Sequence, residues 1–152
     1  MEVFRLSRKK YSSKLSGNGA ALKGARWNSP GIEIIYTASN KSLAMAEVAV
    51  HLTLATLPPD YMMSKIFIPD YLEIKLVKVN ELPKNWNSFP YQLTTQKFGD
   101  QFIFEKNYCL LKIPSATTKG DFNILINPNH PEFKKIKILD SERFPFDKRI
   151  FR

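Results

Sequence analysis

The feature that most constrains the fold of this chain is an apolar, helix-forming run that contains a single acid. The run is Leu43-Ala44-Met45-Ala46-Glu47-Val48-Ala49-Val50. No Lys or Arg lies three or four positions from Glu47 to pair with it on a helix. A helix packed through this stripe carries the carboxylate toward the interior, where an unpaired charge is costly. We therefore expect a working site at Glu47. The alternative is a Glu at the edge of the buried face, with its carboxylate in water.

Length and composition indicate one folded domain. The chain has 152 residues, of which 43% are hydrophobic and 12% aromatic, as in globular proteins. No apolar run approaches the roughly 20 residues that span a bilayer. Arg5 and the Arg8-Lys9-Lys10 cluster interrupt any apolar signal segment near the start. We expect a single cytoplasmic domain over residues 1–152, with no membrane partner.

Cysteine and histidine are too scarce for a metal centre. One cysteine, Cys109, excludes an internal disulfide, and with two histidines, His51 and His130, we expect no metal. Cys109 lies in the apolar run Tyr108-Cys109-Leu110-Leu111, which predicts a buried, inert thiol.

The net charge of +9 implies an anionic partner: nucleic acid, a phosphorylated small molecule or an acidic protein surface. The positive residues are spread along the chain, without an arginine-rich arm or the aromatic pattern of an RNA-binding sheet. Charge alone supports a basic nucleic-acid-binding module, so we keep that function as an alternative and expect no direct nucleic-acid binding.

The order of the expected elements predicts an α+β domain. Strands are expected over residues 2–6, 32–37, 65–68, 72–79, 108–113, 122–126 and 135–139. Helices are expected over 41–54, capped by Ser39 or Asn40, and over 94–105, where Gly99 is a weak point. Residues 7–31 and 80–93 are expected to be irregular, and long loops are often functional. The order is not a regular βαβ alternation.

Two common nucleotide-binding solutions are absent from the sequence. Residues 17–22, Gly-Asn-Gly-Ala-Ala-Leu, lack the third glycine of the dinucleotide fingerprint, and there is no phosphate-cradling Gly-Lys-Ser/Thr loop. There is also no Gly-x-Ser-x-Gly elbow. A nucleotide would therefore bind outside the Rossmann and P-loop arrangements.

At four further positions a site role competes with a simple structural role. Arg26, beside Trp27, could bind phosphate through its planar guanidinium. The alternative is a structural role, in which the guanidinium stacks on the indole and stabilises a turn. Tyr36 is either a core aromatic with a surface hydroxyl or a platform for a flat ring. Ser115, at a strand end, and Asn127, before a proline, have ordinary turn roles as alternatives.

Taken together, these segments resemble the RES-domain family, named for an Arg, a Glu and a Ser. The resemblance runs in order through nearly the whole chain. The matching segments are Phe4-Arg5-Leu6, Gly24-Ala25-Arg26-Trp27-Asn28-Ser29-Pro30-Gly31, Ile35-Tyr36-Thr37-Ala38-Ser39, Ser42-Leu43-Ala44-Met45-Ala46-Glu47, Phe98-Gly99-Asp100, Ile113-Pro114-Ser115-Ala116 and Asn123-Ile124-Leu125-Ile126-Asn127-Pro128-Asn129-His130-Pro131. Phe102 departs from the pattern, which has a tryptophan after the Gly-Asp pair, and this changes packing more than chemistry.

The resemblance implies a mixed-sheet core like that of ADP-ribosyltransferases. It also implies a toxin of a toxin–antitoxin pair, neutralised by an antitoxin with an Xre-like helix-turn-helix domain. NAD is then the substrate, consumed by hydrolysis, by phosphorolysis or by ADP-ribose transfer to a protein. Carried over, Arg26, Glu47 and Ser115 are the catalytic residues, and together with Tyr36 they bind NAD. The nucleophile, any protein target and the oligomeric state, a homodimer included, stay open.

Cleavage of the nicotinamide–ribose bond suits a site with one acid. Ordinary glycosidases need two carboxyl groups, because the leaving oxygen must be protonated. Nicotinamide leaves a cationic ring as a neutral molecule, so no acid is needed and one carboxylate suffices. We expect Glu47 to hold the ribose hydroxyl and favour the developing positive charge. Arg26 would then bind the pyrophosphate, Tyr36 would pack near nicotinamide, and Ser115 would bond substrate or Glu47.

Overall fold

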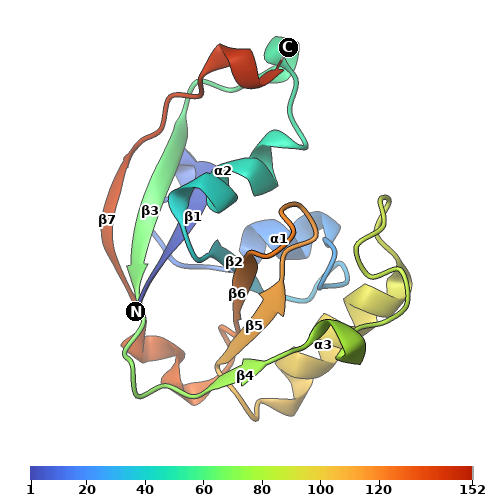
Figure 1. The fold of residues 1–152 in the computed structure, drawn as a ribbon. Coiled ribbons are helices and arrows are strands. Elements are labelled where there is room, and N and C mark those ends of the chain that lie inside the picture. Colours follow the sequence, from blue (N-terminus) through green and yellow to red (C-terminus); the bar gives the residue numbers. More distant parts are fainter. Residues whose placement is uncertain (152) are drawn as a thin grey trace.

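The computed structural model describes residues 1–151 and has an α+β architecture, as predicted (Figure 1). One mixed sheet has the strand order β4-β5-β6-β2-β1-β3-β7, and its neighbouring strands are antiparallel except for the parallel pair β4 and β5. The strands are β1 (Glu2–Arg8), β2 (Ile35–Ala38), β3 (Tyr61–Phe67), β4 (Ile74–Leu76), β5 (Leu110–Pro114), β6 (Phe122–Ile126) and β7 (Lys137–Arg143). The helices are α1 (Asn18–Lys23), α2 (Lys41–Ala49) and α3 (Leu93–Glu105), and single 3-10 turns cover Lys9–Tyr11, Leu54–Thr56, Val79–Glu81, Pro131–Lys135 and Lys148–Phe151.

The sheet consists of two well-paired parts that meet at one point. Strand β1 pairs with β3 along its whole length, and β2 pairs with β6 through all of its residues. Between β1 and β2, in contrast, the register of the described residues contains the single pair Phe4 and Ala38. Figure 1 shows β1, β3 and β7 on one side of this junction and β2, β6, β5 and β4 on the other. The ladder ends there, and this ending shapes the site described below.

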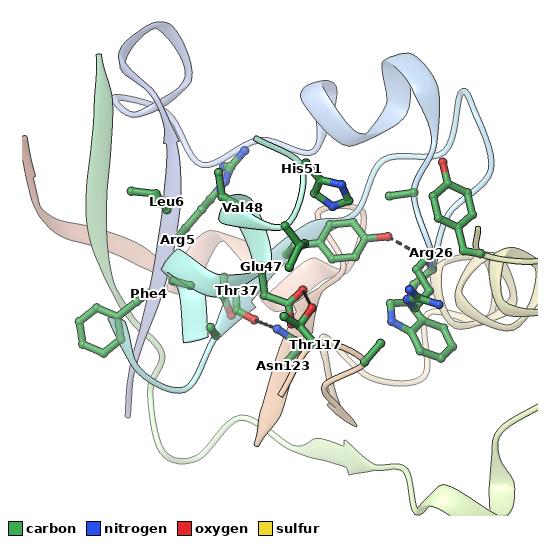
Figure 2. A pocket seen from close by; sticks show the side chains of 18 of the residues that line it. Phe4, Arg5, Leu6, Arg26, Thr37, Glu47, Val48, His51, Thr117 and Asn123 are labelled. Atoms are coloured by element: carbon green, nitrogen blue, oxygen red, sulfur yellow. Dashed lines mark hydrogen bonds between the residues drawn. The ribbon is translucent and has the colours of Figure 1, made fainter. Parts of the chain in front are cut away.

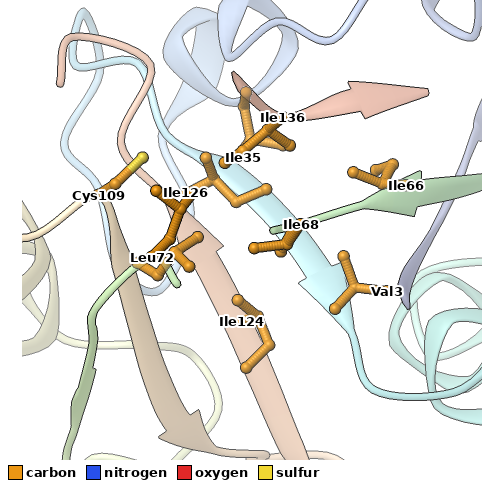
Figure 3. Close-up of a cluster of buried hydrophobic side chains, with 10 residues drawn as sticks. Val3, Ile35, Ile66, Ile68, Leu72, Cys109, Ile124, Ile126 and Ile136 are labelled. Atoms are coloured by element: carbon orange, nitrogen blue, oxygen red, sulfur yellow. The ribbon is translucent and has the colours of Figure 1, made fainter. Parts of the chain in front are cut away.

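Apolar side chains hold the two parts together. Val3 of β1 and Ile66 of β3 share one buried cluster with Ile35 of β2 and Ile124 of β6 (Figure 3). A second cluster joins Leu6, Ala38 and Met63 to Leu43 and Ala44 of α2. Each fully buried aliphatic side chain contributes about 1.5–3 kcal/mol through the hydrophobic effect. The junction is therefore stabilised by packing and not by backbone pairing.

Helix α2 begins as predicted and ends early. The Asn40 side chain accepts a hydrogen bond from the Leu43 amide at 2.8 Å, which makes Asn40 the cap. The helix ends at Ala49 and not at residue 54 as expected, because Thr53 takes an extended conformation (φ −123°, ψ 162°) and caps the next turn. Its partner there is Thr56, whose hydroxyl accepts the Thr53 amide at 3.1 Å.

The structure differs from the sequence expectations in other elements, and two of these differences follow from strand pairing. The expected loop 7–31 contains helix α1, and the expected strand 72–79 is reduced to β4. The strand expected over 32–37 begins at Ile35, opposite Ile126, where its partner β6 ends. The strand expected over 65–68 begins at Tyr61, because β1 continues to Arg8 and offers it a partner. The strand expected over 135–139 begins at Lys137, after a 3-10 turn. Within residues 1–151 no helix is long and apolar enough to cross a membrane.

Gly99 is a close-contact position in α3 and not merely a weak point. A Cβ atom at this position would lie 1.7 Å from the Trp27 carbonyl oxygen. Trp27 is itself buried, with its ring stacked on Trp86 and in edge contact with Phe98. The glycine therefore lets α3 lie directly on the backbone of the segment that carries Arg26 and Trp27.

We predict that Gly99→Ala lowers the free energy of unfolding by about 3 kcal/mol or more, since the added methyl group forces backbone apart. Gly19→Ala is the matched control, because Gly19 is also helical and has nothing within 4 Å of an added Cβ. That variant should gain roughly 0.5–1 kcal/mol. Urea unfolding of both variants measures the difference, and equal midpoints would contradict the close contact.

Candidate active site

A cavity of about 600 Å³ opens where the β1–β2 ladder ends. Its walls come from β1, β2 and α2, and from segments around residues 25–27, 87–91 and 116–117 (Figure 2). The polar residues among those that line it are Arg5, Arg26, Tyr36, Thr37, Glu47, His51, Asn87, Tyr91, Thr117 and Asn123. The volume lies within the range of small-molecule and cofactor sites.

Glu47 reaches this cavity from α2, so the inward direction expected from the sequence is confirmed. Its Oε1 accepts a hydrogen bond from the Ser115 hydroxyl at 2.8 Å, and its Oε2 accepts one from the Thr117 hydroxyl at 3.0 Å. Figure 2 shows Glu47 and Thr117 side by side. The salt bridges among the described residues do not include Glu47. Two hydroxyls therefore hold the carboxylate, and its charge is not cancelled by a contacting cation.

Arg26 lines the cavity and also anchors the wall segment that contains Trp86 and Ser88. Its Nη1 donates to the backbone carbonyls of Trp86 at 2.8 Å and Ser88 at 2.7 Å. Burial lowers the pKa of the Arg26 guanidinium, and the Glu47 carboxylate acts in the opposite direction. Both of these hydrogen bonds use Nη1, so Nε and Nη2 are the nitrogens that remain for an anion.

Tyr36 presents its ring to the cavity and uses its hydroxyl internally. The hydroxyl donates to Asn28 Oδ1 at 2.7 Å and accepts the Trp27 amide at 3.0 Å. Burial strongly raises the pKa of the Tyr36 phenol, so the ring stays neutral. The hydroxyl is thus not on the surface, and the exposed part of this residue suits packing against a flat group.

Arg5 is a site residue that the sequence reasoning did not single out. It follows Phe4, the β1 residue paired with Ala38 of β2, and it lines the cavity beside Val48 (Figure 2). Burial lowers the pKa of its guanidinium, which takes part in none of the salt bridges among residues 1–151. The available signal was its position two residues from the core residue Val3, which places a cation on a buried strand face.

The segment held by Arg26 brings aromatic side chains to the cavity. Phe89 and Tyr91 line it, and Phe89 is 77% exposed. Trp86 anchors the same segment by stacking on Trp27 with ring centroids 6.3 Å apart. An anchored segment with exposed rings is suited to binding a flat, apolar group.

The remaining sequence candidates lie outside the cavity wall. Ser115 is buried behind Glu47, with its hydroxyl directed at the carboxylate. Asn127 has a structural role, since its side chain donates to the Ile103 carbonyl and accepts the Asn129 amide. Cys109 is buried as predicted, and burial raises the pKa of its thiol to about 11. Among the described residues no His, Cys, Asp and Glu cluster is suited to a metal ion.

Comparison with known proteins assigns the chain to a family. The model of the RES domain family matches residues 2–147. The chain belongs to the RES domain family. Among curated relatives, a Sphingobium protein named Prs ADP-ribosylating toxin is 35% identical over 91% of this chain and 87% of its own length. A Yersinia enterocolitica protein named Toxin Res is 32% identical over 99% of each chain.

A solved structure shares the fold of this RES domain. The crystal structure of the Mycobacterium tuberculosis MbcT–MbcA toxin–antitoxin complex contains a chain that superposes with a TM-score of 0.77. The match covers 94% of this chain and 83% of that one, at 18% sequence identity. The family resemblance and the mixed-sheet fold expected from the sequence are both confirmed.

We predict that Arg26→Gln loosens the segment 84–92. The variant loses charged hydrogen bonds to two carbonyls, each worth about 1.5–3 kcal/mol. Amide hydrogen exchange in residues 84–92 should accelerate by about tenfold or more, while exchange in β5 and β6 stays unchanged. Arg143→Gln on the exposed strand β7 is the control. Unchanged exchange in 84–92 would show that Arg26 does not anchor this wall.

Proposed function

We propose that this protein is the toxin of a toxin–antitoxin pair and that it consumes NAD by cleaving the nicotinamide–ribose bond. Water or phosphate is the acceptor of the ribosyl group. The observation that carries the proposal is the Glu47 carboxylate, held by hydroxyls at the wall of a cavity that also contains Arg5 and Arg26.

The charges of the cavity fit the charges of NAD. Glu47 is the only acid among the lining residues within 1–151, and Arg5 and Arg26 are the Lys or Arg side chains among them. NAD carries an anionic pyrophosphate and a cationic nicotinamide ring. Two guanidinium groups suit the pyrophosphate, because each offers several donors in a planar arrangement. One carboxylate suits the positive charge that develops on the ribose.

Four of the lining residues then have a role in the reaction. Glu47 binds a ribose hydroxyl and stabilises the oxocarbenium-like transition state as the bond to nicotinamide breaks. Arg5 and the free nitrogens of Arg26 bind the pyrophosphate. The neutral ring of Tyr36 packs near nicotinamide. The bond electrons leave with nicotinamide, which becomes neutral, so the site needs no acid.

The relatives support the biological role. Relatives that align over nearly the whole chain are named as toxins, and the solved neighbour is part of a toxin–antitoxin complex. We therefore propose a cognate antitoxin with an Xre-like helix-turn-helix domain as the partner. The second candidate activity is protein ADP-ribosylation, favoured by the name of the Sphingobium relative. It uses the same bond cleavage and differs only in the acceptor.

We predict that Glu47→Gln folds but loses NAD cleavage by about 100-fold or more, because the change keeps the shape and removes the charge. Expression of the wild type should arrest growth and lower cellular NAD, and the variant should do neither. Glu73→Gln, an exposed acid outside the cavity, is the matched control. Growth and NAD are measured together at equal expression.

The outcomes separate the candidate functions. Free ADP-ribose, or its phosphorylated form in phosphate buffer, identifies hydrolysis or phosphorolysis. Label transferred from NAD to a protein, with little NAD lost, identifies ADP-ribosylation. Growth arrest that persists in Glu47→Gln and tracks salt-dependent nucleic-acid binding would refute both in favour of a basic nucleic-acid-binding module.

We predict that Arg5→Met weakens NAD binding by about tenfold or more, since a pyrophosphate contact is lost while the side-chain length is kept. Binding is measured by calorimetry in the Glu47→Gln background, so that substrate is not consumed. Arg143→Met is the control for loss of one positive charge. Unchanged affinity in Arg5→Met would place the pyrophosphate elsewhere.

A further inference from the structure

The loop that joins β5 to β6 holds both oxygens of the Glu47 carboxylate. We propose that Ser115 and Thr117 are positioning residues, which act on the reaction only through Glu47 and contact neither the leaving group nor the acceptor. The catalytic part of this proposal rests on the proposed function. Its structural part rests on the hydrogen bonds of the loop alone.

Ser115 has no hydrogen-bonding capacity left for a substrate. A serine hydroxyl offers one donor and two acceptor lone pairs. The donor goes to Glu47 Oε1 at 2.8 Å, and the oxygen accepts the amides of Thr117 and Thr118 at 3.0 Å each. The side chain is also only 5% exposed and does not line the cavity. Burial and the position outside the cavity wall argue against Ser115 as a nucleophile, and the filled hydrogen-bonding capacity argues against it as a direct ligand.

Thr117 holds the second oxygen of the Glu47 carboxylate. It lies in the cavity wall, and its hydroxyl donates to Glu47 Oε2 at 3.0 Å. The two hydroxyls therefore hold different oxygens of one carboxylate, which fixes the plane of the group at the end of a flexible side chain. The loop itself is fixed, because the Ser115 amide donates to the Asp121 carbonyl at 2.9 Å and the Asp121 amide to the Thr118 carbonyl at 3.2 Å.

Hydroxyl donors suit this task better than cations. A Lys or Arg in contact with Glu47 would also hold it, but would cancel much of the charge that stabilises an oxocarbenium ion. Neutral hydroxyls orient the carboxylate and leave its net charge directed at the cavity. A preorganised group needs no rearrangement at the moment of reaction.

Steady-state kinetics of NAD cleavage by the purified protein tests the catalytic part. We expect Ser115→Ala and Thr117→Val each to lower kcat by about tenfold to 100-fold with KM changed less than about twofold. Thr117→Ser, which keeps the hydroxyl, should retain activity within about threefold of the wild type. Thr118→Val is the matched control, because it removes a hydroxyl from the same loop. It leaves intact the backbone amide of residue 118, which donates to the Ser115 hydroxyl.

Three kinetic results would overturn the proposal. A rise in KM at constant kcat would make Thr117 a substrate contact. If Thr117→Ser and Thr117→Val lower kcat equally, the Thr117 hydroxyl has no role in the reaction. If Thr118→Val lowers kcat as much as Thr117→Val, the loss reflects general damage to the loop. Thr117→Val keeps the shape of the side chain, so the test survives if Ser115→Ala fails to fold.

A double-mutant cycle on unfolding tests the contact without activity. Thr117→Val should destabilise the wild type more than it destabilises Glu47→Ala, since the partner is absent from the second protein. Additive effects would refute the contact. If the wild type does not cleave NAD, the proposed function fails. Non-additive effects in the unfolding cycle would still establish that the Thr117 hydroxyl holds Glu47.

Discussion

The site depends on the end of one strand ladder. Phe4 and Ala38 are the last residues at which β1 and β2 are in register, and beyond them the two strands become facing walls of the cavity. Giving up backbone pairing costs hydrogen bonds that a continuous sheet would make. Apolar packing offsets this cost, because Val3 and Ile35 bury their side chains in one cluster across the junction. The opening is therefore held by the core around it.

Helix α3 supports the opposite wall through several hydrogen bonds and one close backbone contact. Asp100 accepts both the amide and the hydroxyl of Ser29, at 2.9 and 2.5 Å. Gln96 donates to the carbonyls of Ala25 and Asn28 at 3.2 Å each. These bonds, with the close approach at Gly99, fix the turn from which Arg26 reaches the cavity. A substitution on α3 can thus alter the site without touching a ligand.

The sequence was sufficient where function follows from local pattern. The bounds of β6 and the capped start of α2 were predicted correctly, and the isolated acid in an apolar helix pointed to Glu47, which lines the cavity. Long-range geometry was not accessible in this way. Thr117 and Glu47 are 70 residues apart, and nothing in a Ser-Ala-Thr-Thr turn indicates which carboxylate it will hold. Arg5 was not predicted as a site residue, because the cavity beside it is formed where the pairing of β1 with β2 ends.

The distribution of partners explains why these charges indicate function. Exposed ions of this chain pair with each other, as Arg149 does with Asp147 at 2.6 Å. Some partly buried ions also pair, as Arg8 does with Asp60. In the cavity, in contrast, Arg26 bonds carbonyls, and Glu47 bonds hydroxyls. Direct pairing of Arg26 with Glu47 would reduce the cost of burying both, yet neither makes that contact among the described residues. Stability alone favours that pairing. Under the proposed function, a ligand that brings an anion to the arginines and a developing cation to the glutamate would supply the compensation that the free protein lacks.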